Sequence, residues 1–166
     1  MLLVLILLIP LLTGIVCLLV RKHWLMETLN LLAFGGSLVL SIVLLHQVLE
    51  KGVVTTWDSF FRADALSAWM ILLVTVVSLS SAFYARSYFR HELAAGDITS
   101  ARVREFYVLT PFFSAAMCLV LLADNLGVMW VALEVTAMAS VLLVALYNRP
   151  NSLEASTRFR VCTGTW

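Results

Sequence analysis

Five long runs of apolar residues divide this chain, with short polar segments between them. The runs cover residues 2–20, 28–48, 65–84, 106–123 and 126–147. Each is long enough to cross a bilayer, because a transmembrane helix needs about 20 mostly apolar residues. The pattern predicts an all-α polytopic membrane protein. Its bundle of five transmembrane helices would fill residues 1–147, and a cytoplasmic tail would follow over residues 148–166.

Composition supports a membrane protein of one domain. Of the 166 residues, 62% are hydrophobic and 13% charged, and the mean hydropathy is +1.00, well above that of a soluble domain. A net charge of +1 gives no basic surface for nucleic acid. The first run lacks the leading positive charge of a signal peptide, so we expect it to be retained as a helix. The lipid bilayer is therefore the expected surrounding of most of the chain.

No cofactor or metal site is expected from the sequence. Cys17, Cys118 and Cys162 are isolated from one another, and two of them lie within apolar runs, where a thiol behaves as a small hydrophobe. There is no cysteine cluster, haem motif or nucleotide-binding loop.

The distribution of lysine and arginine predicts an orientation. Alternate connections place nine of the eleven on one side, namely Arg21, Lys22, Arg86, Arg90, Arg102, Arg104, Arg149, Arg158 and Arg160. Lys51 and Arg62 fall on the other side. Because cytoplasmic loops carry the excess of positive charge, we expect an outside N-terminus and a cytoplasmic C-terminus.

Several features outside the apolar runs give smaller expectations. The loop 50–64 has β-branched and aromatic residues around Gly52 and could form a small extended element, whereas 86–104 reads as a polar cytoplasmic connection. Pro111 is expected in the first turn of the fourth helix or at a mild kink, and a gate is the alternative. His46, near the end of its run, is read as an interfacial residue more readily than as a proton relay.

Glu134 is the one charged residue within the five runs. It lies about 12 Å along the fifth helix from Leu126 at 1.5 Å per residue, near the middle of the hydrocarbon. An acidic residue costs about 2.5 to 3.5 kcal/mol there, so such residues usually face protein or water and tend to be functional. The other charged residues fall at the edges of the runs, where they can reach headgroups and water: Glu27, Asp64, Glu105, Asp124 and Arg149.

The sequence around Glu134 predicts which way it points. Ala132, Thr136 and Ser140 form a ridge of small residues that permits close helix packing, and this ridge lies opposite Glu134. One side of the helix is thus shaped for packing and the other for a polar contact. We therefore expect Glu134 to be buried within a bundle, as a proton or cation site. The alternative is a structural glutamate bonded to a hydroxyl group on a neighbouring helix. The possible polar neighbours are Ser78, Thr75 and Asp124.

The stretch from Ala123 to Thr136, which contains Glu134, resembles the antiporter-like membrane subunits shared by respiratory complex I, Mrp-type sodium/proton antiporters and membrane-bound nickel-iron hydrogenases. Phe61 to Ser67, and Tyr147 followed by Ser152 to Ala155, look most like the hydrogenase-4 component F branch of formate hydrogenlyase-type complexes. The resemblance implies a proton-translocating subunit in which Glu134 works with a lysine of a broken seventh helix. Its implied partners are other membrane and hydrogenase or oxidoreductase subunits, with protons or sodium ions as the transported ions, in the bacterial inner membrane.

The resemblance covers residues 1 to about 156 and then fails. Where the family continues into a sixth apolar helix, this chain carries Arg158, Arg160 and Gly164. We expect a truncated product that is not competent for transport alone, since no lysine or arginine lies inside a predicted span as a partner for Glu134. A small autonomous proton-coupled transporter and an inactive structural membrane fragment are the alternatives.

Overall fold

The structure of this chain, a computed structural model, describes residues 2–20, 22–56, 60–95 and 100–145. Within these ranges the helices are α1 (Leu2–Leu19), α2 (His23–Lys51), α3 (Ala65–Ala95), α4 (Ser100–Leu122) and α5 (Leu126–Ala145). All five are long and apolar enough to cross a membrane. The predicted all-α membrane bundle is confirmed. The predicted tail, residues 148–166, lies outside the described residues.

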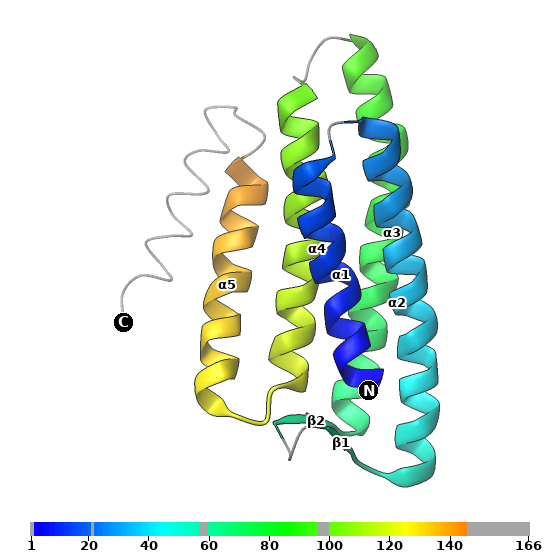
Figure 1. Cartoon of the computed structure of the whole chain (residues 1–166), viewed down its shortest axis with the longest axis vertical. Helices are drawn as coiled ribbons and strands as arrows, with labels where there is room; N and C mark the ends of the chain where they lie inside the picture. Colours follow the sequence, from blue (N-terminus) through cyan, green and yellow to red (C-terminus); the bar gives the residue numbers. More distant parts are fainter. Residues whose placement is uncertain (1, 21, 57–59, 96–99, 146–166) are drawn as a thin grey trace.

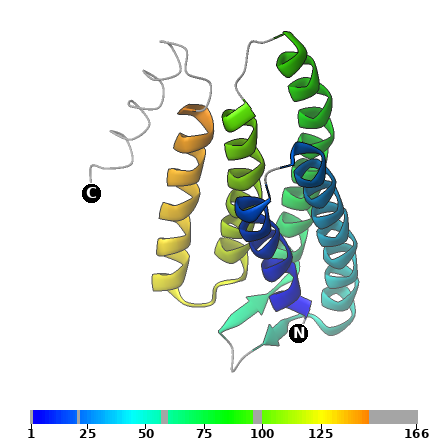
Figure 2. The same ribbon diagram turned by 45° about the horizontal axis from the view of Figure 1, so that its top comes forward.

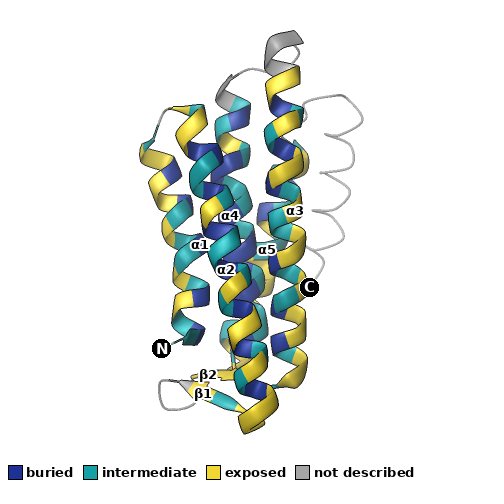
Figure 3. Ribbon diagram, turned by 90° about the vertical axis from the view of Figure 1, so that its right-hand side faces the viewer, coloured by how far each residue is buried: buried dark blue, intermediate teal, exposed yellow. Residues whose placement is uncertain are grey.

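The helices run up and down, with α4 at the centre of the bundle (Figure 1). α4 packs against α1, α3 and α5, while α2 packs mainly against α3 and α1. α5 lies against α4 at one edge of the bundle, as a second view also shows (Figure 2). The outward sides of the helices carry most of the exposed residues (Figure 3). Many of these are large and apolar, as expected of helices that face lipid.

A small β-hairpin closes one end of the bundle. β1 (Val54–Thr56) pairs with β2 (Phe61–Ala63) in antiparallel register, Thr55 opposite Arg62. The extended element predicted within residues 50–64 is therefore confirmed. Gly52 allows the chain to leave α2, because its φ of +81° suits a residue without Cβ, and its N–H donates to the Val48 carbonyl.

The hairpin leads directly into the capped start of α3. The Ser67 N–H donates to Asp64 Oδ1 at 2.8 Å, and this bond holds the pKa of the Asp64 carboxyl below its usual range. Asn125 caps α5 in a similar way, since its Oδ1 accepts from the Gly127 N–H at 2.8 Å.

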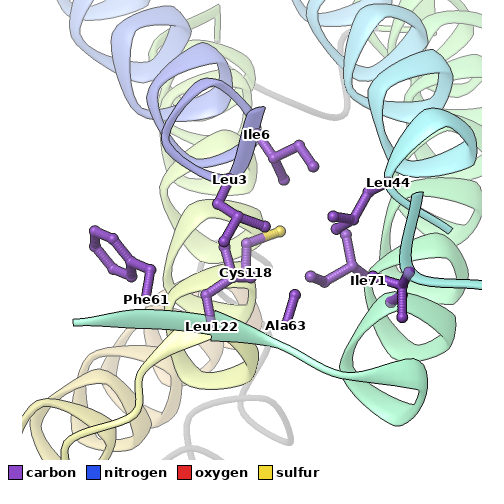
Figure 4. Packing of buried hydrophobic residues seen from close by; sticks show 10 residues of the cluster. Leu3, Ile6, Leu44, Phe61, Ala63, Ile71, Cys118 and Leu122 are labelled. Atoms are coloured by element: carbon purple, nitrogen blue, oxygen red, sulfur yellow. The ribbon is translucent and has the colours of Figure 1, made fainter. Parts of the chain in front are cut away.

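Two apolar clusters hold the bundle together. At the hairpin end, Leu3 and Ile6 of α1 pack with Leu44, Ile71, Cys118 and Leu122 above the hairpin residues Phe61 and Ala63 (Figure 4). At the opposite end, Cys17, Met26, Phe89 and Tyr107 join α1, α2, α3 and α4. The clusters therefore fix both ends of the four helices that precede α5.

The helices extend beyond the apolar runs at several ends. α3 continues to Ala95 and α4 begins at Ser100, so much of the polar segment 86–104 is helical. For the same reason Pro111 lies in the interior of α4, not in its first turn. The charged residues that follow an apolar run need not end the helix, because Lys, Arg and Glu are good helix formers where the helix emerges from the bilayer.

The charges separate between the two ends of the bundle. Lys22, Arg86, Arg90, Arg102 and Arg104 lie at the end where α1 meets α2 and α3 meets α4, which we call the arginine end (Figure 1). Lys51 and Arg62 lie at the opposite end, which we call the hairpin end. The remaining members of the predicted cytoplasmic set lie outside the described residues. Which end faces the cytoplasm stays a prediction.

Candidate functional site

Glu134 lies on the side of α5 that faces away from α4. Of the predicted ridge, Ala132 is buried against the bundle at 1% exposure, whereas Thr136 and Ser140 are half-buried. Ala139, which was not part of the ridge, is also buried. Residues two apart on a helix differ by about 200°, which turns Glu134 outward. Its side chain is exposed in the described part of the chain. The expectation that Glu134 is buried within the bundle is therefore wrong for these residues.

The surroundings of Glu134 are apolar. Trp130 and Met138, one turn before and one turn after it, are 68% and 62% exposed on the same side of α5. Leu133 and Val135, on either side in sequence, are also exposed. A carboxylate at the centre of such a face would contact hydrocarbon in a bilayer, which is costly unless protein or water covers it.

The hydroxyl groups expected near Glu134 are bonded elsewhere. Thr75 Oγ1 lies 3.1 Å from Ser41 Oγ between α3 and α2, and Ser78 Oγ donates to Ser114 Oγ at 3.2 Å between α3 and α4. Asp124 lies at the hairpin end, before α5 begins, and its Oδ1 is 3.9 Å from Arg62 Nη1. Each of the three thus has a partner other than Glu134 in the described residues.

A different carboxylate, Glu27 of α2, is the buried one. Its side chain is 7% exposed, and its Oε2 lies 2.9 Å from Arg90 Nη2 and 3.5 Å from Arg86 Nε. Both arginines come from α3, one helical turn apart, and each is about half exposed. The placement of Glu27 at an edge open to water was wrong, because α2 begins at His23 and turns Glu27 toward α3.

Glu27 belongs to a polar stripe on the inward face of α2. The stripe consists of His23, Glu27, Asn30, Ser37 and Ser41, whose spacing of three, four and seven residues places them on one side of a helix. The spacing is visible in the sequence and could have identified Glu27. The mean hydropathy of the run conceals this spacing, since the residues between the polar ones are large and apolar.

Asn30 satisfies a carbonyl that a proline leaves free. Pro111 has no N–H, so the Tyr107 carbonyl, four residues earlier in α4, lacks its helical donor. Asn30 Nδ2 donates to that carbonyl at 3.1 Å. The two positions lie 77 residues apart in sequence, and the bond ties α2 to the interior of α4. Pro111 is therefore accommodated by a partner from another helix.

Some polar atoms of this region are buried without a protein partner. They are His23 Nδ1, Asn30 Oδ1, Ser37 Oγ and Tyr107 Oη. Internal water usually bonds such atoms when there is room for it. Among the residues that the structure describes, no three of His, Cys, Asp or Glu lie close enough to hold a metal ion.

The exposed His46 side chain fits an interfacial position. Its Nδ1 lies 3.6 Å from Glu50 Oε1, one helical turn later, and both side chains are more than half exposed near the hairpin end. Among the described residues, His46 has no buried partner that could pass a proton to it.

Comparison with known proteins identifies the family of this chain. Residues 56–95, from β1 to the end of α3, match the family model described as NADH-ubiquinone oxidoreductase (complex I), chain 5 N-terminus. A hydrogenase-4 component F homolog of Methylacidiphilum infernorum is 30% identical over 143 residues, which are 86% of this chain. The chain belongs to the antiporter-like family of membrane subunits.

Other members of the antiporter-like family match over much of the chain. NADH-quinone oxidoreductase subunit L of Rhodobacter capsulatus is 30% identical over 69% of it, and F(420)H(2) dehydrogenase subunit L of Methanosarcina mazei is 29% identical over 77%. In the other direction, the chain spans 28% of the hydrogenase-4 relative and 16% and 19% of these two. It thus corresponds to less than a third of each of these relatives.

Proposed function

We propose that this chain acts as the N-terminal part of a proton-translocating antiporter-like subunit in a membrane-bound hydrogenase of the hydrogenase-4 type or in an NADH-quinone oxidoreductase-like complex. Glu134 is the proposed proton-binding residue. The proposal places the protein in the bacterial inner membrane, with the arginine end in the cytoplasm. Its partners are other membrane and oxidoreductase subunits, and it carries no redox site of its own.

The observation that carries the proposal is the position of Glu134. It lies at mid-helix in α5, within a stretch that resembles the antiporter-like subunits, on the side opposite the packing ridge. A carboxylate kept there for structure alone would be bonded to a neighbouring hydroxyl, and the two expected candidates are bonded elsewhere, Thr75 to Ser41 and Ser78 to Ser114. An outward carboxylate on an apolar helix is available to a group from a further helix or subunit.

Glu27 is a poorer candidate for the transported proton. Two arginines contact its carboxylate and tie the side chain to α3. We assign it a role in joining α2 to α3 at the arginine end. The contacts with Arg86 and Arg90 occupy the Glu27 carboxylate, whereas the Glu134 side chain is exposed and can be reached by a further group.

The experiment is proton transport by inverted membrane vesicles that contain the assembled complex. Glu134→Gln should abolish transport while the chain still co-purifies with the hydrogenase or oxidoreductase subunits. Glu105→Gln is the matched control, because Glu105 is an exposed carboxylate of α4 near the arginine end, and it should transport normally. Normal transport by Glu134→Gln would refute the assignment of the proton site.

A second measurement separates the proposal from an autonomous transporter. The purified chain alone, reconstituted in liposomes with a pH-sensitive dye inside, should conduct no protons, since no cation within its predicted spans can pair with Glu134. A proton flux that disappears in Glu134→Gln would instead favour a small autonomous transporter. Failure to co-purify with any oxidoreductase subunit, together with no flux, would favour an inactive membrane fragment.

A further inference from the structure

An apolar groove runs along the side of the bundle between α1, α4 and α5. It has a volume of about 190 Å³. Its lining residues are all apolar and comprise Leu7, Leu11, Phe112, Ala115, Ala116, Leu119, Val131, Ala132 and Val135. An apolar cavity of about 150 Å³ stays dry and accepts a small hydrocarbon, so this groove favours hydrocarbon over water.

The floor of the groove is largely covered by the flanking helices. Its floor consists of Ala115 and Ala116 on α4, which are only 3% and 6% exposed. α1 and α5 thus already cover the face of α4, whereas a packed helix needs an interaxial distance of 8 to 10 Å to it. The small alanine side chains keep this floor low, and the open part of the slot lies between larger residues at its edges, such as Leu11, Leu119 and Val135. At its outer edge Val131 and Val135 of α5 are about half exposed, which opens the slot toward the bilayer.

A cationic side chain lies on the same seam at the arginine end. Arg104 Nη2 of α4 donates to the Leu18 carbonyl near the end of α1 at 2.6 Å, so the guanidinium bridges the two helices. It has no acidic partner in the described part of the chain. A guanidinium carries five N–H donors in a planar arrangement that suits a phosphate, which leaves donors for a ligand.

The distance between the arginine and the groove matches one leaflet of a bilayer. Arg104 precedes Ala115 by eleven residues on α4, and Leu18 follows Leu7 by eleven residues on α1. Eleven residues are about three helical turns. The two members of each pair therefore lie on the same face of their helix, about 16 Å apart along its axis. Half of the hydrocarbon core is about 15 Å thick. A lipid with its phosphate at Arg104 would therefore place the distal part of its acyl chain in the groove.

From this juxtaposition we propose that the groove between α1, α4 and α5 binds one acyl chain of an anionic phospholipid whose headgroup phosphate is held by Arg104. The small side chains of Ala115, Ala116 and Ala132 provide the slot, and the arginine selects the headgroup charge. Basic residues between transmembrane helices bind anionic headgroups in this way. The site is distinct from Glu134, which points away from the α4 face of α5.

The test uses the full chain in phosphatidylcholine nanodiscs that contain phosphatidylglycerol with a photoreactive diazirine near the end of one acyl chain. After irradiation, mass spectrometry of peptides should locate the label on groove residues such as Leu11 and Leu119. The exposed face of α3 around Val77 should be labelled several-fold less. An excess of unlabelled phosphatidylglycerol should compete with the probe, and phosphatidylcholine should not.

Variants distinguish the groove from general contact with lipid. Val135→Trp, at the exposed edge, should reduce groove labelling several-fold, whereas Val77→Trp on α3 is the matched control and should leave it unchanged. Both positions are about half exposed or more, so neither change disturbs the core. Arg104→Gln should reduce the preference for phosphatidylglycerol over phosphatidylcholine about fivefold, the factor expected of one arginine near an anionic headgroup.

Three outcomes would overturn the proposal. The first is equal labelling of the groove and of the α3 face. The second is groove labelling that is indifferent to the headgroup and to Arg104→Gln. The third is an absence of lipid label in the groove together with cross-links there between two copies of the chain, which would make the groove a contact between copies.

Discussion

Glu27 and Glu134 are two carboxylates within membrane-spanning helices, and their surroundings are opposite. Glu27 is 7% exposed and has two arginines within 3.5 Å, whereas Glu134 is exposed among large apolar side chains. Glu27 lies on the inward stripe of α2 and joins two helices. Glu134 lies on the outward face of the helix that packs only at the edge of the bundle. The first has its charge balanced within the described chain, and the second does not.

The difference indicates how to tell a structural carboxylate from a transport carboxylate in such a bundle. A buried ion pair is strongly destabilised by the loss of one partner, because the other charge is left uncompensated. An unpaired carboxylate on an apolar face contributes nothing to the fold of its own chain and costs free energy on insertion. Substitution of the two residues should therefore affect stability in opposite directions.

The largest expected effect concerns the insertion of α5. Glu134→Leu should make insertion of this segment into the membrane more favourable by about 3 kcal/mol, because an acidic residue near the helix centre is costly and leucine is favourable. Insertion can be measured from the glycosylation pattern of α5 placed in a host protein. Val135→Leu is a matched control with almost no expected change. Equal insertion of wild type and Glu134→Leu would mean that Glu134 does not lie at mid-membrane.

A smaller effect of opposite sign is expected at Glu27. Glu27→Gln should lower the free energy of unfolding by about 2 kcal/mol, below the 3 to 5 kcal/mol of a fully buried pair, because Arg86 and Arg90 are about half exposed and can turn toward water. Unfolding by sodium dodecyl sulphate in mixed micelles would measure it. In the same assay Glu134→Gln should not destabilise the chain. A Glu27→Gln variant as stable as wild type would remove the distinction between the two residues.

The sequence predicted the five helices well because about 20 apolar residues in a row have few other solutions. Of the packing ridge predicted for α5 it identified Ala132, which is buried, whereas Thr136 and Ser140 are only half-buried. It did not predict that Glu134 is exposed, because the sequence of one helix does not show which of its faces another helix covers. Glu27 was missed for another reason. Its partners, Arg86 and Arg90, are about 60 residues away, in a segment that the sequence marked only as polar and that α3 extends into.

The inward stripe of α2 can be tested through its bond to α4. Asn30→Ala should cost about 1.5 kcal/mol, because the Tyr107 carbonyl that Pro111 leaves free would be buried without a donor. In a Pro111→Ala background the helix supplies an N–H to that carbonyl, so Asn30→Ala should cost clearly less. A double-mutant cycle in the same unfolding assay gives the coupling. Additive costs would show that the bond between Asn30 and α4 contributes no stability.

The smallest effect is expected at Asp64, a carboxylate outside the membrane-spanning segments. Asp64 caps α3, and Asp64→Ala should cost about 1 kcal/mol near pH 7. Because the bond to the Ser67 N–H lowers the pKa of Asp64 in the folded chain, this contribution is complete above the ordinary pKa of 3.8. It is lost as the pH falls through the lower folded value.

The difference in stability between wild type and Asp64→Ala should therefore shrink below about pH 4, which unfolding measured across this range would detect. Asp124→Ala is the control, because its contact with Arg62 is 3.9 Å long and partly exposed, and such pairs contribute little. A cost at Asp64 that does not depend on pH would mean that the cap acts through shape and not through charge.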